Sequence, residues 1–128
     1  MVVSGNKELV WVGSSLKDLR EFPEDVRQVV GYALYLAQMG EKHPDAKPLR
    51  GFSGAGVLEV VDNFDGDTYR TVYTVRFADA VYVLHAFQKK SKRGIGTPGH
   101  VVEVIRERYE WARRLHAARG PSQPGGGR

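Results

Sequence analysis

The sequence contains no cysteine among its 128 residues, which excludes disulfide bonds, thiolate metal ligands and thiol nucleophiles. It also contains no apolar run near the roughly 20 residues that a membrane-spanning helix needs. The N-terminus lacks a basic region followed by a long apolar stretch, so it does not resemble a signal peptide. The four histidines show no metal-ligand spacing. These absences predict a cytoplasmic protein that uses no metal, no cofactor and no membrane.

What the chain does contain is typical of a globular protein: hydrophobic residues make up 41% of it and charged residues 27%. A chain of this length fits one compact domain with a modest core. We assign this domain to residues 1–119. The remaining residues, GPSQPGGGR at 120–128, are rich in glycine and proline and are expected to form a flexible tail.

Basic residues are concentrated toward the C-terminus. Residues 86–119 hold nine Lys and Arg against three Glu, a balance of +6, whereas residues 1–85 hold nine against twelve acidic residues, a balance of −3. Four of the cations fall within 89–93, shortly after the apolar segment 80–84. Because four like charges this close repel one another, the segment is either a solvated loop or an anion-binding surface. The asymmetry is compatible with a nucleic-acid surface or an acidic partner.

Hydrophobic periodicity predicts seven elements in the order β-α-α-β-β-β-α. Two short turns join the last three strands, which makes these strands antiparallel because a parallel pair needs a long crossover. The fold class is therefore α/β or α+β, with a four-stranded, largely antiparallel sheet packed by helices. Residues 41–56 are expected to be a connector. The strands are expected at 8–12, 57–61, 69–77 and 80–88, and the helices at 16–20, from Pro23 to a terminal Gly40, and after Pro98.

The two longest predicted strands carry basic residues on the sheet. Strict alternation groups four residues on one face of each strand: Arg70, Val72, Thr74 and Arg76 in the first, and Val81, Val83, His85 and Phe87 in the second. Because an arginine stands at each end of the first group, we do not expect its face to be a core face. Antiparallel neighbours could gather several basic groups around one sheet edge or concavity, namely Arg50, Arg70, His85 and the 89–93 cluster.

A family resemblance is carried by one long segment, KPLRGFSGAGVLEVVDNFDGDTYRTVYTVRFADAVYVLHAFQKKSKRGIGTP. Its features are a Lys-x-Leu-x-Gly connector, a strand with Leu-Glu, a Tyr-Arg-x-x-Tyr strand, and the run LHAFQKKS followed by Thr-Pro and a helix. On these motifs the sequence resembles the phage Gp49-like (HigB-type) branch of the RelE/ParE toxin superfamily. The resemblance covers roughly residues 7–115, and the run at 84–90 is its most specific part.

This resemblance implies a RelE-like fold and the function of a toxin in a type II toxin–antitoxin pair. Members of the branch are ribosome-dependent mRNA endonucleases, in which the RNA's own 2′-hydroxyl attacks the adjacent phosphate without a metal. The implied partners are mRNA on the ribosome and a cognate antitoxin with a helix-turn-helix domain. Two other functions stay open: a non-enzymatic gyrase inhibitor like the ParE branch, and an inactive protein that only binds its antitoxin.

The resemblance also implies site residues. Arg70 would hold the scissile phosphate, because a planar guanidinium can bind two phosphate oxygens at once. Lys89 and Lys90 would add positive charge, and His85 would be the candidate general acid or base. Four further cations would contact the flanking RNA: Lys47, Arg50, Lys92 and Arg93.

Each of these assignments has a structural alternative. The basic cluster could be a solvated strand exit that keeps a sheet edge from aggregating. Arg70 could form an ion pair with Glu59 on a neighbouring strand, and His85 could be a packing residue among apolar neighbours. Tyr69 and Phe87 could stack on bases or pack in the core. Four arginines of the last helix are expected on a solvated face or an antitoxin surface: Arg106, Arg108, Arg113 and Arg114.

Overall fold

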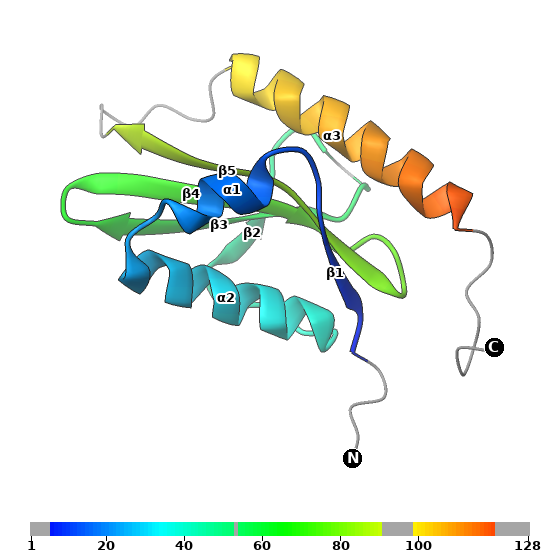
Figure 1. The fold of residues 1–128 in the computed structure, drawn as a ribbon, viewed down its shortest axis with the longest axis horizontal. Coiled ribbons are helices and arrows are strands. Elements are labelled where there is room, and N and C mark those ends of the chain that lie inside the picture. The colour runs from blue at the N-terminus through cyan, green and yellow to red at the C-terminus, as the bar shows by residue number, and fades with distance from the viewer. Residues whose placement is uncertain (1–5, 53, 91–98, 120–128) are drawn as a thin grey trace.

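A five-stranded sheet with helices on both faces forms the protein, as Figure 1 shows for the computed structural model. This structure describes residues 6–52, 54–90 and 99–119. The strands are β1 (Glu8–Trp11), β2 (Ala46–Pro48), β3 (Val57–Phe64), β4 (Asp67–Thr74) and β5 (Ala80–Lys90). Their order in the sheet is β1-β5-β4-β3-β2, in which β1 is parallel to β5 and the other neighbours are antiparallel. The predicted fold class is confirmed, and the seven predicted elements occur in the predicted order with one further strand, β2, between α2 and β3.

The sheet has five strands, not the predicted four, because part of the expected connector is a short strand. β2 pairs antiparallel with β3, and Ala46 lies opposite Val60. Three residues are too few to show the alternation by which a strand is recognised in a sequence. Pro48 also argues against a strand in the sequence, because proline lacks the N–H that a strand donates. Proline is tolerated here because β2 lies at the edge of the sheet.

The helices divide the protein into three layers with one core on each side of the sheet. α1 (Ser15–Arg20) and α2 (Glu24–Gln38) pack on one face, and α3 (Gly99–Ala118) packs on the other. Buried residues of α2 recur with helical spacing, as the sequence predicts. They are Val26, Val30, Ala33, Leu34 and Ala37, and their counterparts on α3 are Val101, Ile105, Tyr109 and Ala112.

The end of α2 follows the prediction from the sequence. Gly40 has a φ of +84°, a left-handed conformation that glycine adopts without strain. Its N–H bonds the Ala37 carbonyl, and the Glu41 N–H bonds the Leu36 carbonyl at 2.7 Å. These two bonds are those of a Schellman motif, which satisfies carbonyls that the helix would otherwise leave unpaired.

β5 contributes side chains to both cores. Val81 and Val83 pack with α1 and α2, whereas Tyr82 and Leu84 pack with α3. All four side chains are buried. A strand that is covered on both faces needs apolar residues at consecutive positions, which explains the unbroken run from Ala80 to Leu84.

The alternation of β5 is interrupted by a β-bulge. Tyr73 of β4 lies opposite Val83, but the adjacent residue Val72 lies opposite His85. Leu84 is therefore an extra residue on β5 without a partner on β4. The sequence gives no sign of this bulge, because the extra residue is an ordinary apolar residue within an apolar run. A prediction from strict alternation therefore could not include it.

The bulge makes the expected grouping of β5 side chains wrong. Ala86 packs in the core of α1 and α2 together with Val81 and Val83. Phe87 packs on the opposite side, toward α3, with Leu84. Beyond the bulge, the described β5 side chains as far as Lys89 therefore point to the face opposite to the one that strict alternation predicts.

The prediction that the Arg70 face of β4 is not a core face is also wrong for most of its length. Val72 and Thr74 on this face are completely buried, and Val72 belongs to the α3 core. Arg76 lies beyond the end of β4, where it is exposed and donates to the Tyr109 hydroxyl. Arg70 alone of the two arginines lies within the strand.

No helix in the described part of the chain is long and apolar enough to cross a bilayer. The predicted tail at 120–128 lies outside the described residues, as do Lys92 and Arg93 of the basic cluster.

Replacing two of the glycines by alanine should change the free energy of unfolding in opposite directions. Gly31 lies exposed in α2 with nothing near the position of a Cβ, so Gly31→Ala should raise the free energy of unfolding by about 0.5–1 kcal/mol through helix propensity. Gly66 has a φ of +86° in the turn between β3 and β4, so Gly66→Ala should lower it by about 1–2 kcal/mol. Urea unfolding of both variants measures the difference, and equal effects would contradict the assigned turn.

Candidate functional site

The register of the sheet lines up the candidate residues on its α3-facing surface. Directly opposite residues on antiparallel strands point to the same face, so each row across the strands shares a face. The first row is Lys47, Glu59, Val72 and His85; the second is Val61, Arg70 and Phe87; the third is Asn63, Thr68 and Lys89. Three of the predicted cations, Lys47, Arg70 and Lys89, are therefore brought to one surface.

Arg70 forms an ion pair with Glu59. Its Nη1 donates to Glu59 Oε2 at 2.9 Å, and the two side chains are only 17% and 12% exposed. The Arg70 Nε is buried without a hydrogen-bond partner. The ion-pair alternative for Arg70 is thus present in the structure. A phosphate that binds Arg70 has to share its guanidinium with Glu59 or displace the carboxylate.

The other predicted cations surround this pair at different distances along the sheet. Lys47 is exposed and lies opposite Glu59, and Arg50 is exposed in the loop after β2. Lys89 lies two residues beyond Phe87 on β5, which corresponds to about 7 Å along the strand. Lys90 is the last residue of β5, and its side chain is outside the described part.

His85 is held by Arg108 of α3. Its Nδ1 lies 3.2 Å from the Arg108 Nη1, and because a guanidinium can only donate, Nδ1 is the acceptor. The ring proton therefore resides on Nε2. Burial, followed by the charge of Arg108, lowers the pKa of His85 from 6.5 to about 4, although Asp18 acts in the opposite direction. His85 is neutral at physiological pH.

A neutral His85 with an occupied Nδ1 is poorly suited to exchange protons with a substrate. Its ring instead stacks on Phe87, with 5.0 Å between the ring centroids. The predicted acid–base role of His85 stays a prediction, and the packing alternative has the support of this geometry.

One residue of the site was not assigned a catalytic function from the sequence. Glu59 was considered only as a partner of Arg70, yet it is a carboxylate beside a phosphate-binding candidate and opposite Lys47. Its place between these two cations depends on the register of three strands, which the sequence does not give. Arg106 of α3, which was expected on a solvated face or an antitoxin surface, is exposed and lies over the ring of Phe52, 4.8 Å from its centroid.

Arg108 corrects the expectation that the arginines of the last helix form a solvated face. Its Nη1 donates to the Leu84 carbonyl at 2.9 Å and its Nη2 to the Ser14 hydroxyl at 3.2 Å. By contrast, Arg113 and Arg114 are exposed, as expected. The spacing of the four arginines along the helix does not show that Arg108, unlike the other three, is turned toward β5.

The two aromatic candidates lie on opposite faces of the sheet. Tyr69 is buried in the α1–α2 core, where its ring meets Phe22 edge-on at 4.9 Å. Its packing alternative is therefore the correct one. Phe87 is partly buried and lies opposite Arg70, on the face that carries the cations. Only Phe87 is placed to contact a base near Arg70.

Metal ligands do not gather in this surface. Across the described ranges, no group of three or more His, Asp or Glu side chains could hold a metal ion.

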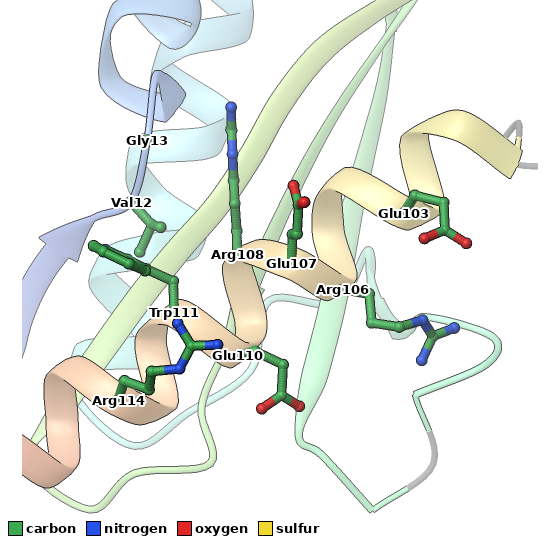
Figure 2. Close-up of a pocket in the computed structure, with 9 residues that line it drawn as sticks. All are labelled: Val12, Gly13, Glu103, Arg106, Glu107, Arg108, Glu110, Trp111 and Arg114. Atoms are coloured by element: carbon green, nitrogen blue, oxygen red, sulfur yellow. The ribbon is translucent and has the colours of Figure 1, made fainter.

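A second concave surface lies along α3, away from Arg70. Figure 2 shows Trp111 beside Val12 at the wall of this groove, which has a volume of about 710 Å³. The groove combines acidic and basic side chains, and half of the Trp111 side chain is exposed. It contains none of the predicted site residues. Its charged lining residues are Glu103, Arg106, Glu107, Arg108, Glu110 and Arg114.

The low pKa of His85 predicts a specific loss of stability in acid. The unfolded chain, with a histidine pKa near 6.5, binds more protons than the folded chain between pH 6.5 and about 4. The free energy of unfolding should therefore fall as pH is lowered through this range. His85→Gln removes this contribution, so its urea-unfolding free energy should fall less between pH 7 and pH 5 than that of the wild type. Equal losses in the two proteins would refute the neutral, buried state of His85.

Comparisons with known proteins agree with this fold. The family described as phage-derived protein Gp49-like (DUF891) matches residues 17–110. Among solved structures, a mutant of the Escherichia coli toxin RelE in the free state is 20% identical, with a TM-score of 0.53 over 83% of this chain and 97% of that chain. The RelBE2 toxin–antitoxin complex of Mycobacterium tuberculosis is 19% identical, with a TM-score of 0.46 over 66% of this chain and 99% of that chain.

No curated protein matches the chain at a significant level. The likeness to RelE, at 20% identity, is a likeness of fold. The family match, however, extends over well more than half of the sequence. The chain therefore belongs to the phage-derived Gp49-like family and has a RelE-like fold.

Proposed function

We propose that this protein is the toxin of a type II toxin–antitoxin pair and acts as an endoribonuclease on mRNA that is being translated. The observation that carries the proposal is the Arg70–Glu59 pair, a cation and a carboxylate together on a sheet surface that also carries Lys47 and Lys89. Membership in the Gp49-like family and the RelE-like fold support it.

The pair can supply the two groups that RNA cleavage by its own 2′-hydroxyl requires. Glu59 accepts the proton of the 2′-hydroxyl, and the 2′-oxygen attacks the adjacent phosphorus. The bond to the 5′-oxygen then breaks, the 5′-oxygen takes a proton from water, and the hydroxide that is left takes the proton held by Glu59, which restores the carboxylate. The products are a 2′,3′-cyclic phosphate and a 5′-hydroxyl. Arg70 donates to the phosphate oxygens, on which negative charge grows in the transition state.

The ion pair in the free protein also prepares both groups for the reaction. A phosphate that reaches Arg70 replaces Glu59 as its anionic partner, which frees the carboxylate to accept a proton. Lys47, which lies opposite Glu59, and Lys89 add positive charge on either side. Lys90 is assigned the same role as Lys89, and the remaining predicted contacts to the RNA backbone are assigned to Arg50, Lys92 and Arg93.

The ribosome is the second component of the proposed substrate. A protein of 128 residues has little surface with which to orient a flexible RNA strand. Orientation of reacting groups contributes a large part of the rate of such a reaction, so the ribosome has to supply it. The proposed site of action is the cytoplasm, and the proposed protein partner is a helix-turn-helix antitoxin that covers the cationic surface.

A reconstituted translation system tests the function directly. The purified protein should cut a translated mRNA and leave 2′,3′-cyclic phosphate ends, with weak or no cutting of the same mRNA in the absence of ribosomes. Mapping of RNA ends by sequencing measures both. Efficient cutting of naked RNA would contradict the ribosome dependence. Intact mRNA together with lost DNA supercoiling by gyrase would favour the ParE-like alternative, and no effect in either assay would favour an inactive antitoxin-binding protein.

Variants of the ion pair test the assigned chemistry. Glu59→Gln keeps the shape and a hydrogen-bond acceptor for Arg70 but removes the base, so cleavage should fall by roughly 10²–10⁴-fold, with a smaller loss of thermal stability than in Arg70→Ala. Arg70→Ala should lower cleavage by roughly 10²–10³-fold. Arg70→Lys should restore only part of the rate, because a point charge cannot make the two-pronged contact. The measurement is the cleavage rate on ribosomes, with a thermal melt for each variant.

A double variant separates catalysis from stability. Arg70→Ala alone leaves a mostly buried carboxylate without its partner, which can cost about 3–5 kcal/mol. Replacing both members by apolar residues of similar size, Glu59→Leu with Arg70→Met, removes that penalty. The double variant should melt near the wild-type temperature and should not cleave. Cleavage at the wild-type rate by this variant would make the pair purely structural.

A further inference from the structure

Arg108 leaves the surface of α3 and crosses to the edge of β5. Figure 2 shows its side chain extending from α3 toward the segment that contains Gly13. Its guanidinium contacts the Leu84 carbonyl, His85 Nδ1 and the Ser14 hydroxyl, at 2.9, 3.2 and 3.2 Å. The Ser14 hydroxyl in turn donates to Asp18 at 2.7 Å. One side chain thus connects α3, β5 and the start of α1.

The loop before α1 leaves room for this side chain because it has a glycine, Gly13, at the point of closest approach. A Cβ at Gly13 would lie 2.7 Å from the Arg108 Nε, a separation that non-bonded atoms do not tolerate. Gly13 also has a φ of +59°, which few other residues adopt without strain. The position therefore requires glycine for two reasons, and one of them is the passage of Arg108.

The Leu84 carbonyl needs this partner because of where it lies. β1 ends at Trp11, and the Val12 N–H makes the last bond from this segment to β5, to the Val83 carbonyl. Leu84 is the extra residue of the bulge and has no partner on β4. A backbone carbonyl left without a hydrogen bond in a protein interior costs free energy, and Arg108 removes that cost.

The bulge determines which β5 side chains join the candidate site. With it, Phe87 lies opposite Arg70, and Lys89 lies opposite Thr68 on the same face. A shift of one residue would turn both side chains to the α1–α2 face of the sheet. Their position beside Arg70 therefore depends on the geometry at Leu84 and His85.

We propose that Arg108 is a positioning residue of this site, which clamps the β5 bulge through Leu84 and His85 and thereby keeps Phe87 and Lys89 on the face of Arg70. Its effect on catalysis rests on the proposed ribonuclease function, whereas its effect on the bulge does not. Arg108 need not touch the RNA, so its loss should act on the rate of the chemical step more than on substrate binding.

The pKa and tautomer of His85 show whether Arg108 is in contact with the bulge. Arg108 faces the histidine from α3, Asp18 of α1 and Glu21 after α1 line the cavity beside it, and Phe87 stacks on its ring. With Arg108 in place, Nδ1 is an acceptor and the ring is neutral. Without Arg108, a repelling positive charge is lost while Asp18 and the burial of the ring remain, so the pKa of His85 should rise part of the way toward 6.5.

Arg108→Met tests the proposal because it keeps the length of the side chain but removes every donor. We expect three changes: a higher His85 pKa with both tautomers populated in ¹⁵N NMR spectra, faster amide exchange at residues 84–88, and a kcat on translated mRNA that is lower by roughly 10–100-fold with KM little changed. Arg108→Lys, which can bond only some of the same acceptors, should lie between Arg108→Met and the wild type. Arg113→Gln is the matched control, since Arg113 is exposed on the same helix and pairs only with Glu110 among the residues described.

The outcomes separate this inference from the proposed function. A wild-type His85 spectrum and wild-type amide exchange in Arg108→Met would overturn the clamp. A changed spectrum with an unchanged kcat would overturn its role in positioning the site. If the wild-type protein does not cleave RNA, the proposed function fails, and the NMR and exchange measurements alone decide the clamp. Should Arg108→Met not fold, the same comparisons are made with Arg108→Lys, whose wild-type behaviour in all three would refute the proposal.

Discussion

The burial of β5 on both faces is the constraint on which the rest of the structure depends. This strand is hydrogen-bonded to β1 and β4 and contributes alternate side chains to the two cores, so each helix layer is placed by its contact with the same strand. A strand in this position cannot slip without exchanging the two cores. The bulge at Leu84 reverses once the face to which alternate β5 side chains point, beyond the end of β1 and just before the residues of the candidate site. The same strand therefore supplies core side chains before the bulge and side chains of the candidate site after it.

The candidate site places an acid where the surrounding charge is positive. Glu59 lies opposite Lys47 and bonds Arg70, so its charge is balanced in the free protein. Taken alone, a mostly buried ion pair is weak support for stability, because desolvation of both groups offsets much of their attraction. Such a pair is easier to understand as a functional arrangement, in which an incoming phosphate takes the place of the carboxylate. The same exchange would explain how one arginine serves both the free protein and the bound state.

Arg108 has two effects near the site, one through its hydrogen bonds and one through its charge. It supplies a donor to a strand carbonyl that the sheet leaves unpaired, and it keeps the neighbouring histidine neutral. The lone histidine of the most specific sequence run therefore has the contacts of a packing residue, while its predicted acid–base role stays a prediction. Arg108 also lines the groove along α3 that Trp111 borders, and this groove carries none of the cations assigned to RNA.

The sequence by itself determined the helices, the hairpin turn, the order of elements and the concentration of cations after β5, because local periodicity, turn residues and charge are properties of neighbouring residues. It also brought Arg70, Lys47 and Lys89 forward as candidates. It missed β2, since three residues show no period, and it misplaced Ala86 and Phe87, since a bulge leaves no mark on composition. Only the tertiary structure decided that Arg70 bonds Glu59 and that Arg108 reaches Leu84 and His85. Those contacts join residues that are 11 to 24 positions apart, and their existence depends on register and packing that no local pattern encodes.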